Sequence, residues 1–264
     1  MNERIAWLIG VLAAIAIGAG LYLTRNHFRE PEPQPAPPVE SPPAQTEPAI
    51  RHPVPQPAAV QPEQAPLPEL AASDVPVREA LSQAVGPDPV AKFLVPDGIV
   101  RRFVATVDNL PRKKVAMQIR AVAPTPGAFV VGGSEEDFTL SEENYARYAP
   151  FVQLVESADA KQLAALYVRF YPLMQESYEG LGYPDRYFND RMVEVIDHLL
   201  ATPEVKGPVR LTQPHVFYEF ADPRLEGLSA GRKALIRMGS ENAATVKRKL
   251  SALRAEIAQR RPSG

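Results

Sequence analysis

The sequence contains no cysteine. It therefore forms no disulfide, offers no thiolate ligand to a metal and has no cysteine nucleophile, although this absence is compatible with any cellular compartment. The HExxH, GxxxxGK[ST] and GxGxxG motifs, which mark metalloprotease, nucleotide and dinucleotide sites, are also absent. The four histidines show no spacing typical of metal ligands. We therefore expect neither a metal nor a cofactor. The absence of these motifs also favours a binding protein over an enzyme.

Charge is distributed unevenly along the chain. Residues 73–223 hold 15 Lys or Arg against 21 Asp or Glu, a net −6, whereas residues 224–264 hold 10 against 3, a net +7. We expect this basic end to pair with the acidic part of the chain, and contact with anionic lipid or nucleic acid is the alternative. Nucleic acid is disfavoured if this part lies outside the cytoplasm. The candidate contacts for a polyanion are Arg232, Lys233, Arg237, Lys247 and Arg248.

One long apolar run dominates the N-terminal part. It begins at Ile5, ends at Leu23 and contains no charged residue. A helix of this length covers roughly the 30 Å hydrocarbon core of a bilayer, and its backbone groups can all pair within the segment. Trp7 and Tyr22 lie near its ends, where aromatic rings favour the interface. We predict a single transmembrane helix over residues 5–23, after a short flank of residues 1–4.

The same run has a second interpretation as a cleaved signal peptide. A permanent anchor is favoured because the run is long and no small-x-small cleavage site follows it. The flanking Lys and Arg do not decide its orientation. The short N-terminal flank favours an inner-membrane protein with a periplasmic C-terminal part. Gly10, Ala14 and Gly18 lie four residues apart, a spacing that would permit a homodimer through close helix contact, but the general Ala and Gly content of the segment is the preferred explanation of this spacing.

A proline-rich segment follows the apolar run. Residues 31–68 contain 14 prolines, so neither a helix nor a central strand can form there. We predict that residues 24–72 form a disordered linker, largely polyproline II, that spans on the order of 100 Å when extended. Such a spacer suits a domain that must reach away from a membrane.

Residues 73–262 carry the pattern of one compact, mostly α-helical domain. Apolar residues recur at three- and four-residue spacing over about 74–85, 97–109, 141–157, 159–179, 185–200, 229–238 and 240–259. Pro172 predicts a kink or a helix end near Tyr171. Alternating residues predict a weak strand over 115–121 and a minor β-hairpin between 209–211 and 216–220.

Two sets of side chains are candidates for chemistry or recognition. Glu176 and Glu179 lie three residues apart near a glycine break, and a carboxylate pair is what a glycan hydrolase requires. Such a pair on one helix is more often a solvated face. Eight of the nine tyrosines fall between residues 145 and 218. Most have core spacing, whereas Tyr183 and Tyr187 flank the break and are candidates for a binding surface.

The stretches HVFYEFADPRLEGLS (residues 215–229) and LSAGRKALIRMGSENAATVKRKL (residues 228–250) resemble a bacterial family. This is the set of membrane-anchored proteins grouped as domain-of-unknown-function family 3014, and the similarity extends from about residue 81 to residue 253. The resemblance implies bacterial origin and a membrane location. It implies no activity, ligand or catalytic residue.

Together these patterns predict an envelope protein with an N-terminal anchor, a spacer and a helical domain that acts as a non-enzymatic binding or scaffold module. The partner would be the bilayer at one end and an envelope protein or cell-wall polymer at the other. The alternative is a cell-wall glycan hydrolase that uses Glu176 or Glu179.

Overall fold

The computed structural model of the chain describes residues 50–55, 66–134 and 137–258. The transmembrane helix expected over residues 5–23 lies outside these ranges, and so do its small residues Gly10, Ala14 and Gly18. Residues 24–49 of the expected linker lie outside them as well. Within the described ranges, no helix combines the length and the apolar character needed to cross a membrane.

The described residues are mostly helical, as predicted. After a 3₁₀ turn at Leu70–Ala72, the helices are α2 (Asp74–Val85), α3 (Pro87–Phe93), α4 (Ile99–Asn109), α5 (Glu143–Ser157), α6 (Ala160–Glu179), α7 (Phe188–Leu200), α8 (Pro223–Glu226), α9 (Ala230–Arg237) and α10 (Ser240–Ile257). The strands are β1 (Val131–Gly132), β2 (Thr139–Leu140), β3 (Leu211–Thr212) and β4 (Glu219–Phe220).

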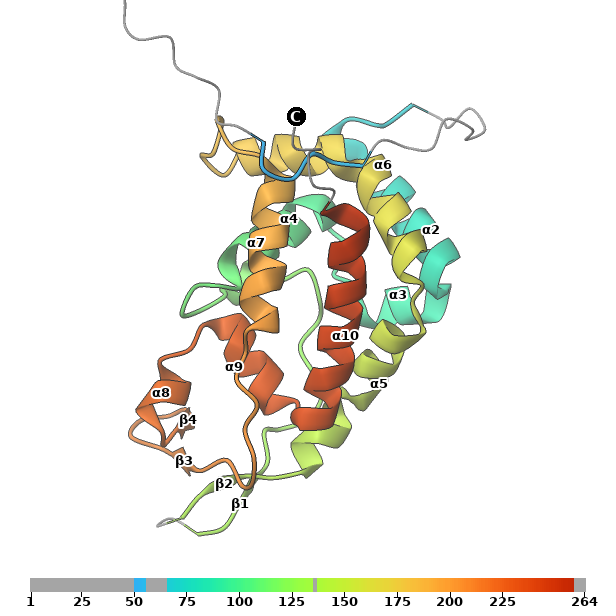
Figure 1. Cartoon of the computed structure of the whole chain (residues 1–264). Helices are drawn as coiled ribbons and strands as arrows, with labels where there is room; N and C mark the ends of the chain where they lie inside the picture. The colour runs from blue at the N-terminus through green and yellow to red at the C-terminus, as the bar shows by residue number, and fades with distance from the viewer. Residues whose placement is uncertain (1–49, 56–65, 135–136, 259–264) are drawn as a thin grey trace, which may run out of the picture. The chain divides into compact units, whose positions relative to one another are not determined.

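The main core lies between the long helices. Helix α10 packs against α5, α6 and α7, and α4 packs against α2, α6 and α7. Figure 1 shows α10 between α7 and α5. Val104, Phe188 and Ile257 are completely buried at this centre. Burial of each such side chain contributes about 1.5–3 kcal/mol, which explains why the apolar spacing alone locates these helices well.

A smaller second core lies under two hairpins. β3 pairs with β4 in antiparallel register, as predicted, and β1 pairs with β2 in a second ladder that the alternation did not predict. The two hairpins meet where Leu140 N–H donates to Val209 and Leu211 N–H donates to Phe138. Ile236 of α9 packs into this second core, so the hairpins are attached to the helical body.

The strand predicted over residues 115–121 is wrong. Met117–Ile119 forms a 3₁₀ turn instead. Thr106 on α4 donates its hydroxyl to the carbonyl of Ile119 at 2.9 Å and accepts the N–H of Ala121 at 3.0 Å. The guanidinium of Arg102 donates to the carbonyl of Gln118. Side chains of α4 thus satisfy backbone groups that a neighbouring strand would otherwise satisfy.

Several helix ends differ from the predicted ones. Helix α6 does not end at Pro172 but continues to Glu179, because its buried face on both sides of the proline packs into the main core. Helix α7 begins at Phe188 rather than near residue 185. The short helix α3, with Pro87 in its first turn, was not predicted.

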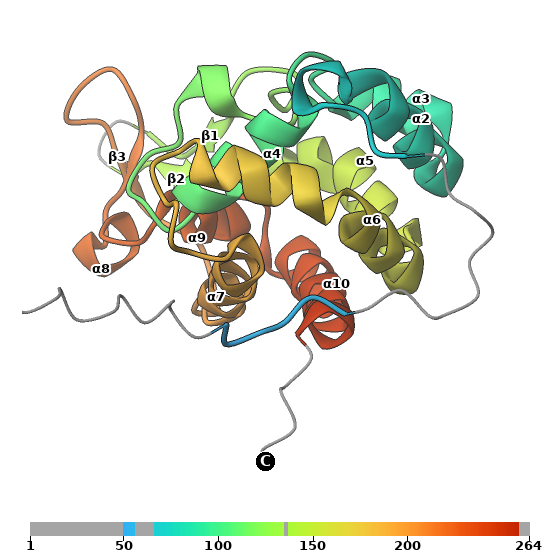
Figure 2. The same cartoon turned by 90° about the horizontal axis from the view of Figure 1, so that it is seen from above.

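The end of the expected linker is attached to the body. Leu67 and Leu70 pack against the main core, and residues 50–55 lie against α7 and the end of α10 (Figures 1 and 2). These pieces have defined contacts, which differs from the prediction of a disordered linker up to residue 72.

Asp74 connects two helices. Its sequence position suggests a cap for its own helix α2, but its two carboxylate oxygens accept the N–H groups of Gly98 and Ile99, each at 2.7 Å. Gly98 has φ +65° and precedes the first residue of α4. Asp74 therefore caps α4, a helix whose start lies 25 residues further along the chain.

We predict that Asp74→Ala lowers the free energy of unfolding by about 1–2 kcal/mol, because two helix N–H groups lose an ionised acceptor. Urea denaturation followed by circular dichroism measures this change. Asp88→Ala is the matched control, since Asp88 is an exposed acid in the first turn of α3. Equal effects of the two substitutions would contradict the role of Asp74 as a cap for α4.

Candidate functional site

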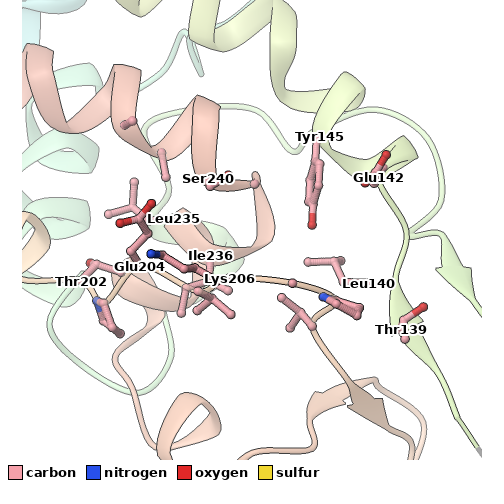
Figure 3. A pocket seen from close by; sticks show the side chains of 18 of the residues that line it. Thr139, Leu140, Glu142, Tyr145, Thr202, Glu204, Lys206, Leu235, Ile236 and Ser240 are labelled. Carbon is pink, nitrogen blue, oxygen red and sulfur yellow. The ribbon is translucent and has the colours of Figure 1, made fainter.

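A large cleft lies between the second core and the start of α10. It has a volume of about 890 Å³ and is lined by the start of α5, the loop 202–209 and the corner between α9 and α10. Figure 3 shows Tyr145 entering it from α5, with Glu204 and Lys206 on the loop side. Lys247 donates its ammonium to the carbonyl of Thr202 at 2.5 Å, so this cation holds the loop in place.

The corner of this cleft is closely packed. Gly239 has φ +87°, and a Cβ added to it would lie 2.7 Å from the ring of Tyr145. Burial, followed by the nearby charge of Glu142, raises the pKa of Tyr145. Besides the neutral phenol of Tyr145 and the bonded cation of Lys247, the lining holds Glu142, Glu204 and Lys206. No hydrogen bond or ion pair among the described residues joins the side chains of this lining into a nucleophile–base pair.

A smaller hollow combines aromatic rings with charged groups. It has a volume of about 390 Å³ and lies beside the start of α7. We call it the tyrosine hollow. Its lining consists of Arg51, Asp108, Tyr178, Tyr183, Asp185, Arg186, Tyr187, Asp190, Arg191 and Glu194. Both candidate tyrosines from the sequence therefore lie in one site.

The floor of the tyrosine hollow is a buried ion-pair network. Asp108 is 2% exposed and comes from the end of α4. Arg191 donates to its carboxylate at 3.0 Å and to its backbone carbonyl at 2.9 Å. Arg112 donates to the other carboxylate oxygen at 2.7 Å, and this bond raises the pKa of Arg112. Arg191 also pairs with Glu194 at 2.8 Å. The network balances its own charge and locks α4 to α7.

The tyrosines form the wall above this floor. The rings of Tyr178 and Tyr183 stack with centroids 4.7 Å apart. Tyr178 is buried, and burial raises its pKa. The Tyr183 hydroxyl accepts a hydrogen bond from Arg112 at 3.1 Å, and Arg186 lies 5.9 Å from the Tyr183 ring centre. Tyr183 and Tyr187 are half-buried, so one ring face of each is supported while part remains accessible.

The docked segment, residues 50–55, closes one side of the hollow. Arg51 and His52 donate their backbone N–H groups to the carboxylate of Asp190 at 3.1 and 2.6 Å. Asn189 donates its side-chain amide to the carbonyl of His52 at 2.9 Å. The Arg51 guanidinium lies 3.9 Å from Glu194 at the rim. Buried groups of α7 thus bind the main chain of this segment.

The basic candidates from the sequence do not form one surface. Arg232 donates to the carbonyl of His198 at 2.8 Å, Lys233 pairs with Glu226, and Arg237 lies over the ring of Phe220. These three and Lys247 are half-buried. Arg248 is exposed and lies 3.8 Å from Glu156. Each cation contacts the rest of the domain, but of these five only Arg248 does so through an acidic side chain of residues 73–223.

The carboxylate candidates are exposed and lie apart from the hollow. Glu179 accepts a hydrogen bond from Gln175 at 2.8 Å. Glu176 lines a separate shallow groove together with Arg101 and Arg102, and Glu179 is not part of that lining. A glycan hydrolase needs two carboxylates that face one sugar linkage. No contact of Glu176 or Glu179 favours that arrangement.

Residues 227–231 have the sequence GLSAG, which matches the GxSxG nucleophile motif. This match was missed among the candidate residues predicted from the sequence. The Ser229 hydroxyl lies 2.8 Å from Nε2 of His198. Ser229 is 6% exposed and caps α9 by accepting the N–H of Arg232. Burial, then the charges of Arg232 and Arg191, lowers the pKa of His198, which favours a neutral ring.

The backbone around Ser229 argues for a structural role. In a hydrolase, the N–H after the nucleophile helps to form the oxyanion hole. Here the N–H of Ala230 donates to the carbonyl of Arg112 at 2.7 Å, and the N–H of Gly231 donates to Leu110 at 2.9 Å. A Cβ on Gly231 would lie 2.6 Å from Leu199 and 3.1 Å from the Leu110 carbonyl. The small residues of the motif therefore allow α9 to pack closely against the end of α4.

Several residues that line the tyrosine hollow or bind the docked segment were missed from the sequence. Asp108, Asn189, Asp190 and Arg191 are polar or charged residues that interrupt apolar helix faces. A polar residue on a buried face is the available signal, because burial of a charge requires a partner. That signal marks the residues but does not identify their partners.

The fold and site define a helical domain with a docked N-terminal segment and no assembled catalytic group in the part of the chain that the structure describes. A family model with the description "Protein of unknown function (DUF3014)" matches residues 99–254. The chain belongs to this family, as its resemblance predicted. The match includes the tyrosine hollow except for Arg51. No curated protein and no solved structure matches the chain.

We predict that Arg191→Ala lowers the free energy of unfolding by about 3 kcal/mol, because it leaves the buried carboxylate of Asp108 without its main partner. Arg112→Ala is the control, and it costs less than about 1 kcal/mol because its side chain is 53% exposed. Chemical denaturation measures both. In an Asp108→Asn background, Arg191→Ala lowers the free energy of unfolding by less. If the effects of Asp108→Asn and Arg191→Ala simply add in this double-mutant cycle, the proposed coupling between the two residues is excluded.

We further predict that Ser229→Ala lowers the free energy of unfolding by about 1–2 kcal/mol, as expected for loss of a helix cap. A fluorophosphonate probe, which labels activated serines, leaves the wild-type protein unlabelled. Covalent labelling that disappears in Ser229→Ala would show instead that Ser229 is a nucleophile.

Proposed function

We propose that this chain is a single-pass, membrane-anchored protein of the bacterial cell envelope, and that its helical domain is a non-enzymatic binding module. The apolar run over residues 5–23 and the proline-rich stretch after it support the anchor and the spacer. The domain would lie on the periplasmic side, where it meets an envelope protein or a cell-wall polymer.

The tyrosine hollow is the observation that carries the binding role. Its floor is neutralised by internal ion pairs, so a ligand need not separate Asp108 from Arg191. Its rim offers the partly accessible faces of Tyr183 and Tyr187 beside the exposed Asp185 and Arg186. Aromatic faces next to hydrogen-bonding groups suit both sugar rings and peptide segments.

The docked segment supports the tether geometry. If the chain leaves the bilayer after Leu23 and is held at Arg51, then residues 24–50 form the free spacer. At about 3.1 Å per residue in polyproline II, 27 residues reach roughly 80 Å. The hollow lies next to the attachment point, so the spacer delivers this side of the domain to its partner.

A binding assay tests this proposal. We expect the full-length chain, purified in detergent, to co-sediment with purified peptidoglycan or to form photo-crosslinks to an envelope protein from position 187 in intact cells. Tyr187→Ala and Arg186→Ala reduce the bound fraction at least fivefold. Phe217→Ala, which removes an aromatic ring that is 80% exposed on the β3–β4 hairpin, leaves it unchanged.

Two outcomes contradict the proposal. A phosphatase reporter fused after Gly264 is expected to be active only outside the cytoplasm, and a cytoplasmic reporter would remove the envelope location. Equal losses in the hollow variants and in Phe217→Ala would remove the hollow as the binding surface. Peptidoglycan cleavage that is lost in Glu176→Gln would favour the hydrolase alternative.

A further inference from the structure

Asn189 and Asp190 bind an extended piece of main chain. The two carboxylate oxygens of Asp190 each accept one N–H, from Arg51 and His52 respectively. The side-chain amide of Asn189 donates to the carbonyl of His52. Three backbone groups of two successive residues are thus satisfied by two adjacent side chains, which we call the clamp. Figures 1 and 2 show this segment crossing α7 and the end of α10.

The clamp is built into the core and not formed by surface side chains. Asn189 is completely buried, and Asp190 is 8% exposed. The Tyr167 hydroxyl donates to the Asn189 side-chain oxygen at 2.9 Å, and Asn189 also donates to the carbonyl of Ile257 at 3.1 Å. These bonds orient the amide before any segment arrives. A pre-oriented site loses little conformational entropy on binding.

The hydrogen bonds of the clamp go to backbone groups. Of the two side chains on the segment, that of His52 is half-buried, and its Nδ1 has no hydrogen-bond partner among the described residues. The Arg51 side chain is 65% exposed, and its nearest approach to Asp190 is 3.9 Å. Proline at position 51 or 52 would remove a donor, because proline has no N–H. Pro53 restricts His52 to extended backbone, which suits this geometry. The site therefore accepts an extended peptide with two successive non-proline residues followed by proline.

We propose that the clamp is an exchangeable peptide-binding site, occupied by the chain's own docked segment and able to take the same segment of a second copy. The second copy is the favoured source because its segment has the chemistry that the clamp binds here. Residues 56–65 join the docked segment to the body, and ten residues can span up to about 33 Å. A second copy whose clamp lies within that distance can therefore receive the segment. The inference goes beyond the proposed function, because it concerns the clamp and a second copy of this chain, not the tyrosine hollow and its envelope partner.

An emptied clamp tests the peptide site. In the full-length chain, the double substitution Arg51→Pro and His52→Pro removes both N–H donors and leaves Asn189 and Asp190 unchanged. A fluorescein-labelled peptide with the sequence of residues 47–56, EPAIRHPVPQ, then binds this variant at least tenfold more tightly than it binds wild type. The wild-type segment competes at an effective concentration on the order of millimolar.

Matched controls separate backbone recognition from side-chain effects. Arg51→Ala with His52→Ala keeps both N–H groups and binds the peptide as weakly as wild type does. The peptide EPAIPPPVPQ, with proline at both positions, does not bind the emptied clamp. Adding Asp190→Asn to the emptied variant abolishes peptide binding. If circular dichroism shows that the Asp190→Asn protein has lost helix, Asp190→Glu is used in its place. Absence of binding to the emptied clamp, or binding that survives both Asp190 substitutions, overturns the proposal.

Mixing complementary variants tests the second copy. The emptied variant has a free clamp, and the Asp190→Asn variant has a free segment. When the two variants carry a donor and an acceptor dye, only their mixture forms a hetero-complex and shows fluorescence energy transfer. If the peptide binds but the mixture forms no complex, the second copy is excluded as the source. These assays use neither cell wall nor Tyr187, so their failure is distinguishable from failure of the proposed function.

Discussion

The buried side chain of Asn189 is the contact on which the arrangement of helices depends. A completely buried amide must have its donors and its acceptor satisfied, since an unsatisfied group costs about 1–3 kcal/mol. Tyr167 of α6, the carbonyl of Ile257 at the end of α10, and His52 of the docked segment meet this requirement. Three distant parts of the chain are therefore held at one point of α7, and their relative positions follow from one polar residue in an apolar core.

The first turn of α7 distributes its residues among separate tasks. Successive residues point about 100° apart around a helix axis. Phe188 enters the main core, Asp190 binds the docked segment, and Arg191 pairs with Asp108 in the floor of the tyrosine hollow. Core, clamp and hollow are thus neighbours because four consecutive residues supply them. This proximity places the docked segment beside the candidate binding surface.

Local pattern predicted the helices and part of the site. Apolar spacing located α4, α6, α7 and α10, because each buries one face whatever its neighbours are. Tyr183 and Tyr187 were recognised because a Gly/Pro break removes them from the core pattern. The strand over residues 115–121 failed because Thr106 and Arg102, remote in sequence, satisfy its backbone. The partners of Asp74 could not be found from local pattern for the same reason, since they lie 24 and 25 residues away.

The helical class follows from the sequence, because periodicity is a local property, and the family follows from the resemblance of residues 215–250. The partners of the buried polar groups follow only from the tertiary structure. Asp108 is an acidic residue whatever its neighbours are, but its place in the floor of the tyrosine hollow depends on Arg191, which is 83 residues away. Likewise, residues 50–55 read as spacer until α7 brings Asn189 and Asp190 against them. Hydrogen bonds and ion pairs act over a few ångströms, and only the folded chain brings these residues within that distance.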